Sequence, residues 1–78
     1  MDAKTSAIRY VLSSTDPKTA ERMVLSFSLP EEEERCIILK EIHHKSIQQI
    51  AFALCISPET VKRRRRSGLL KMVDAISL

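Results

Sequence analysis

The three prolines of this 78-residue chain each stand where a helix would begin. A proline at the first helical position loses no hydrogen bond, and an Asp or Ser just before it can cap the free backbone N–H groups. A separate serine supplies a fourth start signal. The predicted starts are Asp16-Pro17, Leu29-Pro30, Ser46 and Ser57-Pro58. These signals divide the chain into short helices.

Apolar residues recur at helical spacing between these signals, and hydrophobic residues make up 44% of the chain. The chain has one Gly and no segment that alternates apolar and polar residues, so strands have little support. We therefore predict a single all-α domain of four or five helices. The expected helices cover residues 3–13, 16–28, 31–43, 47–54 and 58–75.

The sequence gives no support for a membrane protein or for an enzyme. No apolar stretch approaches 18 residues and no secretory signal is present, so we expect a cytoplasmic protein without a membrane contact. No nucleophile can be paired with a neighbouring base, so we expect no enzyme activity and no catalytic residue. The glutamate run at residues 31–34 is interpreted as a solvated helix start, which the helix dipole favours.

Two cysteines and a histidine pair invite a metal interpretation. Cys36 and His43 lie seven residues apart on one helical face, but their spacing matches no zinc motif. We therefore expect no metal and no cofactor. Because Cys36 and Cys55 both lie among apolar residues, we predict reduced, buried thiols at both positions.

The positive charge is concentrated in one segment. Residues 57–78 hold six basic and two acidic side chains, a net charge of +4, whereas residues 1–56 hold seven basic and eight acidic side chains, a net charge of −1. This asymmetry indicates an anionic partner for the C-terminal segment.

Helical projection of the last segment separates a buried side from an outward side. The buried stripe contains Val61, Gly68 and Met72. The outward side consists of Glu59, Lys62, Arg63 and Arg66. Arg64 and Arg65 flank the buried stripe, where their stems can pack while the guanidinium groups reach solvent or phosphate. A solvated charge run and a localisation tag remain alternatives for this basic segment.

The last two predicted helices are separated by a three-residue turn, which is typical of a helix-turn-helix. Ala51 is small where the two helices would cross, and apolar residues around the turn can fill the space between them. On such a helix, Lys and Arg can bind guanine edges or phosphates, and Glu59 can accept from cytosine. Ser57, Thr60 and the helix N-terminus can donate to the DNA backbone.

The string LPEEEERCIILKEIHHKSIQQIAFALCISPETVKRRRRSGLLKM, residues 29–72, resembles region 4 of sigma-70-family factors without a gap. Its strongest portions are LPEEEE, SIQQIA and ISPETVK. It is also similar to the helix-turn-helix of LuxR-type regulators and of phage regulators of the RinA and ArpU type. The resemblance implies that the last helix enters the major groove of a promoter element. It assigns base-facing positions to Pro58, Glu59, Lys62 and Arg63. Together with the charge pattern, it assigns backbone contacts to Ser57, Thr60, Arg64, Arg65 and Arg66.

The chain departs from the region 4 pattern at three positions. Cys55 replaces the usual turn glycine, which would cost about 1 kcal/mol or more if φ there is positive. His44 replaces a second loop glycine, and Arg64 occupies a position that is commonly apolar. The chain also has only three aromatic residues, so it lacks the stacking side chains that melt promoter DNA.

These observations predict a transcriptional regulator that binds double-stranded DNA sequence-specifically, encoded by a phage or mobile element. Residues 29–78 would form the DNA-binding module, and residues 1–28 a helical extension that completes the core or binds a second copy. The resemblance implies contact with RNA polymerase as well. The alternative is a helical adaptor or sigma-like decoy that binds polymerase or a packaging partner without specific DNA binding.

Overall fold

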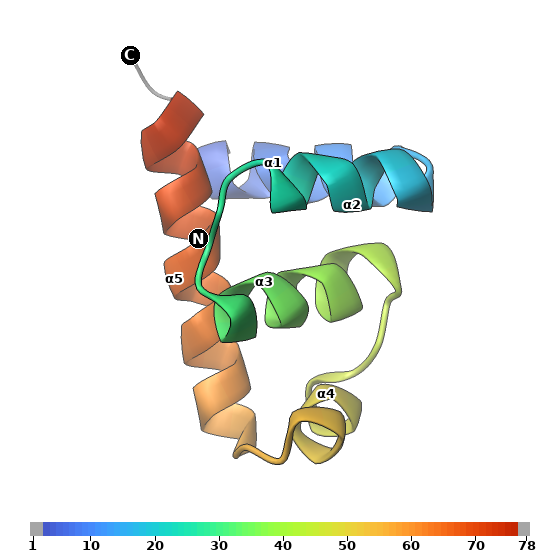
Figure 1. The fold of residues 1–78 in the computed structure, drawn as a ribbon, viewed down its shortest axis with the longest axis vertical. Helices are drawn as coiled ribbons and strands as arrows, with labels where there is room; N and C mark the ends of the chain where they lie inside the picture. Colours follow the sequence, from blue (N-terminus) through green and yellow to red (C-terminus); the bar gives the residue numbers. More distant parts are fainter. Residues whose placement is uncertain (1–2, 77–78) are drawn as a thin grey trace.

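The computed structural model describes residues 3–76, which form five α-helices and a short π-helical segment (Figure 1). The elements are α1 (Ala3–Ser14), α2 (Pro17–Leu25), α3 (Glu31–Ile37), η1 (Ile38–Ile42), α4 (Ile47–Leu54) and α5 (Pro58–Ile76). None of the described residues forms a strand, so the all-α prediction is confirmed. No helix between residues 3 and 76 has the length and apolar character needed to cross a membrane.

Side-chain caps begin α2, α4 and α5 where the sequence predicts them, whereas α3 begins after Pro30 without a side-chain cap. The carboxylate of Asp16 accepts the backbone N–H of Thr19 at 3.0 Å, and this hydrogen bond lowers the pKa of Asp16. At the start of α4, Ser46 accepts the backbone N–H of Gln49 while the Gln49 side chain accepts the N–H of Ser46. This reciprocal capping box satisfies two N–H groups that the helix itself cannot pair.

The third predicted helix changes character at its midpoint. It is α-helical only to Ile37 and continues as the π-helical segment η1, where the N–H of His43 reaches the carbonyl of Ile38 at 3.1 Å. A π turn holds an additional residue, so it rotates the following side chains relative to a regular helix. Within η1, Glu41 and Ile42 are both buried.

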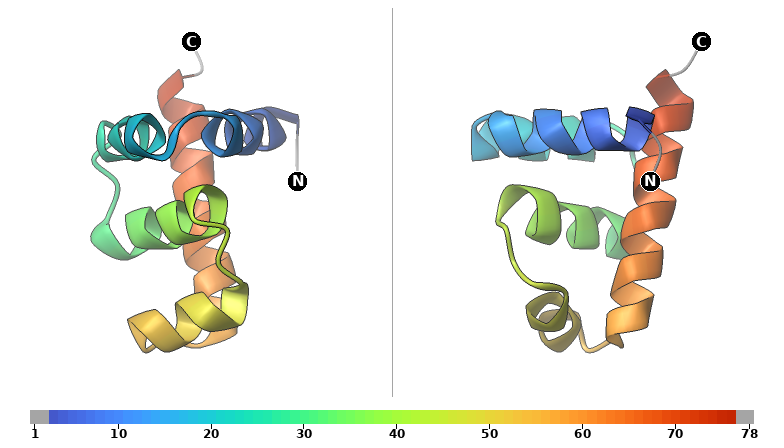
Figure 2. Two further views of the ribbon diagram at one scale, coloured as in Figure 1. Left: turned by 90° about the vertical axis from the view of Figure 1, so that its right-hand side faces the viewer. Right: turned by 180° about the vertical axis from the view of Figure 1, so that it is seen from behind.

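The N-terminal helices share a core with the rest of the chain. Helices α1 and α2 lie side by side in one layer next to α3, and the long α5 runs past both layers (Figure 2). The largest cluster joins apolar side chains from both parts of the chain. Its buried members are Leu12, Ala20, Val24, Leu29, Ile37, Ile42, Leu69 and Met72.

Helix α5 crosses α3 closely at its single glycine. A Cβ at Gly68 would lie 2.5 Å from Cδ1 of Ile37 and 3.3 Å from Cβ of Glu33, so a side chain there would have to displace its neighbours. Val61, Gly68 and Met72 are all buried, which confirms the predicted inner stripe of this helix. The glycine thus sets how near the arginine-bearing helix lies to the core.

The two cysteines have different environments. Cys36 is buried as predicted, but Cys55 is exposed, so the prediction of a second buried thiol is wrong. Cys55 lies in the turn after α4, where the backbone folds away from the core. No group of three or more metal-ligating side chains occurs within residues 3–76.

We expect iodoacetamide to alkylate Cys55 in the folded protein and Cys36 only after unfolding. Burial, and then the negative charge of Glu32, raise the pKa of the Cys36 thiol, so less of the reactive thiolate is present at a given pH. Mass spectrometry of digested protein, labelled with and without urea, measures both rates. Similar rates at the two thiols without urea would contradict the burial of Cys36.

Candidate nucleic-acid interface

Helices α4 and α5 form the predicted helix-turn-helix. Ala51 and Val61 are buried against each other's helices in a second apolar cluster, together with Cys36 of α3 and Ile50. The turn is closed by a hydrogen bond from the N–H of Ile56 to the carbonyl of Ala51 at 3.1 Å. The small side chain of Ala51 therefore lies where the two helices approach, as the sequence predicts.

Both residues that replace loop glycines have left-handed backbone conformations. Cys55 has φ 57° and ψ 44°, and His44 has φ 56°. A side chain in this region costs about 1 kcal/mol or more relative to glycine. The turn geometry expected for region 4 is thus retained despite the substitutions, at the cost of local strain.

Hydroxyl groups gather at the N-terminus of α5. The Ser57 hydroxyl accepts the backbone N–H of Thr60 at 3.1 Å and lies 2.8 Å from the Thr60 hydroxyl. Arg63 donates to the Thr60 hydroxyl over a longer distance of 3.4 Å. Because the N–H groups of a helix start favour anions, these side chains surround a position suited to a phosphate.

The outward side of α5 carries cations that form no ion pair with the described part of the chain. Lys62, Arg63 and Arg66 are all exposed, and none forms an ion pair with a carboxylate of residues 3–76. Together with Glu59, they border a shallow groove of about 490 Å³ along the helix. The positive charge on this side is therefore free to meet an external anion.

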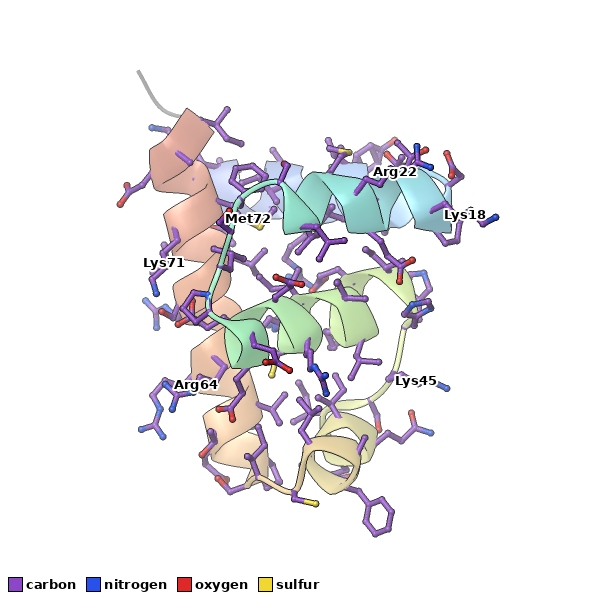
Figure 3. All side chains as sticks on the ribbon, viewed as in Figure 1. Lys18, Arg22, Lys45, Arg64, Lys71 and Met72 are labelled. Carbon is purple, nitrogen blue, oxygen red and sulfur yellow. The ribbon has the colours of Figure 1, made fainter. Side chains whose placement is uncertain are left out.

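Arg64 points toward the start of α3. Its Nε donates to the carboxylate of Glu32 at 2.7 Å, and this hydrogen bond raises the pKa of Arg64. About two helical turns further along α5, the ammonium group of Lys71 donates to the carboxylate of Glu33 at 3.1 Å. Figure 3 shows Arg64 and Lys71 along the same helix, beside α3. Two of the four N-terminal glutamates of α3 thus pair with α5. Because Glu33 is buried, the interpretation of the whole run as solvated is wrong for this residue.

Arg65 is directed into the protein. Its NH1 group donates to one carboxylate oxygen of Glu41 at 2.8 Å, and the Nε of Arg9 donates to the other oxygen at 3.0 Å. The Arg65 side chain is only 13% exposed and that of Glu41 only 6%. The π-helical segment that carries Glu41 therefore joins α1 to α5 through one buried carboxylate.

The structure divides the sequence-predicted site residues into three groups. Glu59, Lys62, Arg63 and Arg66 share the outward face of α5. Ser57, Pro58 and Thr60 form its first turn. Arg64 and Arg65 leave the helix toward Glu32 and Glu41 instead.

The outward groove extends further along α5 than the sequence analysis predicted. Ser67 and Leu70 also line it. The sequence contains the pattern that could have indicated these two residues, because they follow Arg63 and Arg66 by four residues and so lie on the same helical face.

Comparison with known proteins agrees with this geometry. Residues 28–72 match the family described as sigma-70, region 4, and the match contains α3, η1, α4 and most of α5. No curated protein and no solved structure matches the chain. This family consists of DNA-binding helix-turn-helix domains. Since the match covers more than half of its length, the chain belongs to the sigma-70 region 4 family.

Proposed function

We propose that this protein is a transcriptional regulator that binds double-stranded DNA sequence-specifically by placing α5 in the major groove. The observation that carries the proposal is the outward face of α5, where Lys62, Arg63 and Arg66 have no carboxylate partner among the described residues. The diameter of an α-helix with its side chains, about 10 to 12 Å, fits the width of the major groove, and cations along the helix can meet both base edges and phosphates.

The individual roles follow the positions of the side chains. Base-facing roles are proposed for Pro58, Glu59, Lys62 and Arg63. Backbone contacts are proposed for Ser57, Thr60, Arg64 and Arg66. Arg65 is left out of the proposed interface, because its guanidinium group is bound to Glu41 and turned away from solvent. Arg64 keeps a role because its side chain is still 43% exposed beside Glu32.

The family membership and the resemblance to phage regulators support two further proposals. The chain would act in the cytoplasm and contact RNA polymerase, since sigma region 4 domains work together with that enzyme. It would also be encoded by a phage or another mobile element.

An alternative function is a helical adaptor or sigma-like decoy that binds a protein partner. Phe52 favours this alternative, because it is 87% exposed on α4 and single large aromatic side chains often anchor protein interfaces. In that case the basic face of α5 would bind an acidic protein surface without selecting a DNA sequence.

The affinity for duplex DNA as a function of salt concentration distinguishes the two functions. Each phosphate that a cation neutralises contributes about −0.9 to the slope of log affinity against log salt. The two cations assigned to the DNA backbone, Arg64 and Arg66, therefore predict a slope of about −1.8. Selection of bound sequences from a random duplex pool then tests specificity. A flat salt response, or no enrichment in the pool, would favour the adaptor.

A further inference from the structure

One glutamate at the start of α3 lies beside the arginine run of α5. The carboxylate of Glu32 accepts a hydrogen bond from the Nε of Arg64 at 2.7 Å, and the two side chains remain 41% and 43% exposed. Arg64 is also one of the side chains to which a DNA backbone contact is assigned. A carboxylate of the protein and a phosphate of the DNA would therefore meet at one guanidinium group.

The guanidinium group of Arg64 has donors left for a phosphate. Glu32 binds its Nε, whereas its two terminal nitrogens form no ion pair with a carboxylate of residues 3–76. These nitrogens form a fork that matches two phosphate oxygens. A phosphate bound there would lie about 7 Å from the Glu32 carboxylate, because the two anions would contact neighbouring edges of one planar group.

Contacts of the next residue keep the start of α3 beside α5. The buried carboxylate of Glu33 accepts hydrogen bonds from Ser67 at 3.3 Å and from Lys71 at 3.1 Å. The two backbones are also close, because a Cβ at Gly68 would lie only 3.3 Å from the Cβ of Glu33. Moving the start of α3, and with it Glu32, away from an arriving phosphate would break these contacts.

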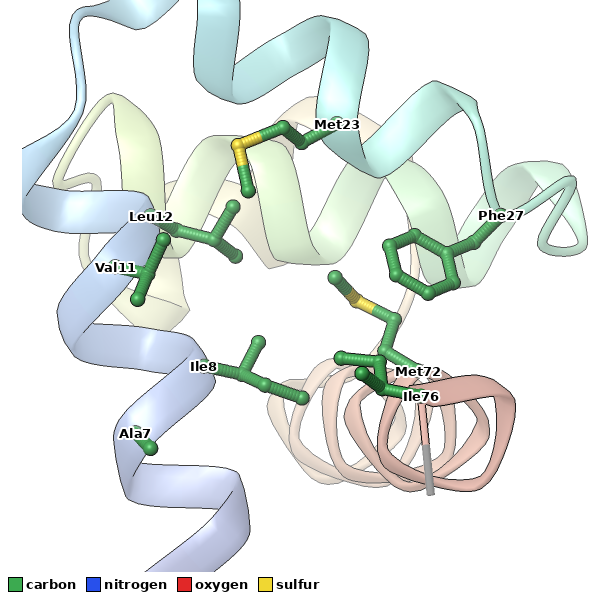
Figure 4. A pocket seen from close by; sticks show the side chains of 8 residues that line it. All are labelled: Ala7, Ile8, Val11, Leu12, Met23, Phe27, Met72 and Ile76. Atoms are coloured by element: carbon green, nitrogen blue, oxygen red, sulfur yellow. The ribbon is translucent and has the colours of Figure 1, made fainter. Parts of the chain in front are cut away.

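The last turns of α5 are held as well. Met72 and Ile76 line an apolar groove of about 260 Å³ together with Ile8 of α1 and Phe27 of α2 (Figure 4). Met72 is also buried in the core that α5 shares with the N-terminal helices. A shift of α5 that separated its arginine run from the start of α3 would disturb this packing.

We propose that Glu32 restrains the DNA binding proposed for this chain, because its carboxylate opposes the phosphate at Arg64. Two like charges about 7 Å apart weaken such a contact by about 3-fold in water. The protein surface lowers the effective dielectric constant and strengthens the repulsion, whereas salt screens part of it. Because the repulsion involves a phosphate and no base edge, it acts on every DNA sequence alike. Glu32 thus sets the strength of binding and leaves the sequence preference unchanged.

Fluorescence anisotropy with a labelled random-sequence duplex at about 0.1 M salt tests the proposal. Glu32→Gln should bind this duplex about 3- to 10-fold more tightly than the unmodified chain. The matched control is Glu31→Gln, which removes the same charge one residue earlier, where Glu31 pairs with Arg35 of its own helix at 2.9 Å. The control should change the affinity by less than about twofold. Circular dichroism should show the same fold for all variants.

A double-variant cycle locates the effect at Arg64. In an Arg64→Ala background, Glu32→Gln should raise the affinity by less than about twofold, because the group that joins the two anions is gone. The ratio of the affinities for a selected duplex and for the random duplex should be the same in Glu32→Gln and the unmodified chain.

Three results would overturn the proposal. The first is an affinity of Glu32→Gln that is equal to, or weaker than, that of the unmodified chain. The second is an equal gain in Glu31→Gln or in the Arg64→Ala background, since the effect would then come from overall charge. The third is a changed ratio between the two duplexes. Failure of the proposed DNA binding is a separate result, since the unmodified chain would then bind neither duplex.

Discussion

Combined substitution of Lys62, Arg63 and Arg66 by alanine is expected to reduce duplex DNA affinity by about 100-fold or more at 0.1 M salt. These three side chains are exposed and form no ion pair with a carboxylate of residues 3–76. Their removal therefore breaks only one internal contact, the long hydrogen bond from Arg63 to the Thr60 hydroxyl at 3.4 Å. The slope of log affinity against log salt should become shallower by about 0.9 units, because Arg66 is the one of these three cations that is assigned to a phosphate. The melting temperature should stay close to that of the unmodified chain. Fluorescence anisotropy at several salt concentrations measures both binding quantities.

The matched control is the combined substitution of Lys18, Arg22 and Lys45 by alanine. It removes the same charge from exposed positions, which Figure 3 shows on the side of the molecule away from α5. Its affinity should fall only by a few fold, through the loss of net charge. If both triple variants lost affinity equally, DNA binding would depend on overall charge and the proposed role of the α5 face would be wrong.

Glu41→Gln is expected to lower the free energy of unfolding by about 2 to 4 kcal/mol. The substitution removes the charge that pairs with both Arg9 and Arg65, and leaves the mostly buried Arg65 guanidinium without a counterion. We place the effect below the full value for a buried pair because Arg9 is partly exposed. For a domain of this size, the melting temperature should fall by roughly 10 to 25 °C. Urea denaturation and calorimetry measure the two quantities.

Glu32→Gln provides the control for this prediction. It breaks the Arg64 pair, in which both side chains are substantially exposed, so its effect on stability should be much smaller. The double variant Glu41→Gln, Arg65→Met should recover part of the lost stability, since it removes the unpaired charge as well. Equal destabilisation by Glu32→Gln and Glu41→Gln would show that burial of the Glu41 network contributes nothing.

Local signals in the sequence were sufficient for the helices and for the outward face. The helix starts at Asp16, Ser46 and Ser57 depend on contacts within one turn, and the inner stripe of α5 depends only on helical periodicity. The Glu41 network could not be predicted in this way. It joins residues from three elements that lie 24 or more residues apart in the sequence, and no local pattern pairs Arg9 and Arg65 with Glu41.

The exposure of Cys55 also depends on backbone geometry that the neighbouring residues do not indicate. Its neighbours in the sequence are apolar, but the left-handed turn directs its own side chain to solvent. The apolar surplus of residues 1–28 was visible in the sequence, and part of it lies in the shared core.

The four consecutive arginines are divided among three environments, because each step along α5 turns the side chain by about 100°. Arg63 and Arg66 face outward, Arg64 reaches Glu32 and Arg65 reaches Glu41. Exchanging one arginine for lysine would alter a single contact. Inserting or deleting one residue within the run would reassign all the positions that follow, and would turn an inner guanidinium out and an outer one in. The segment therefore tolerates changes of composition better than changes of length.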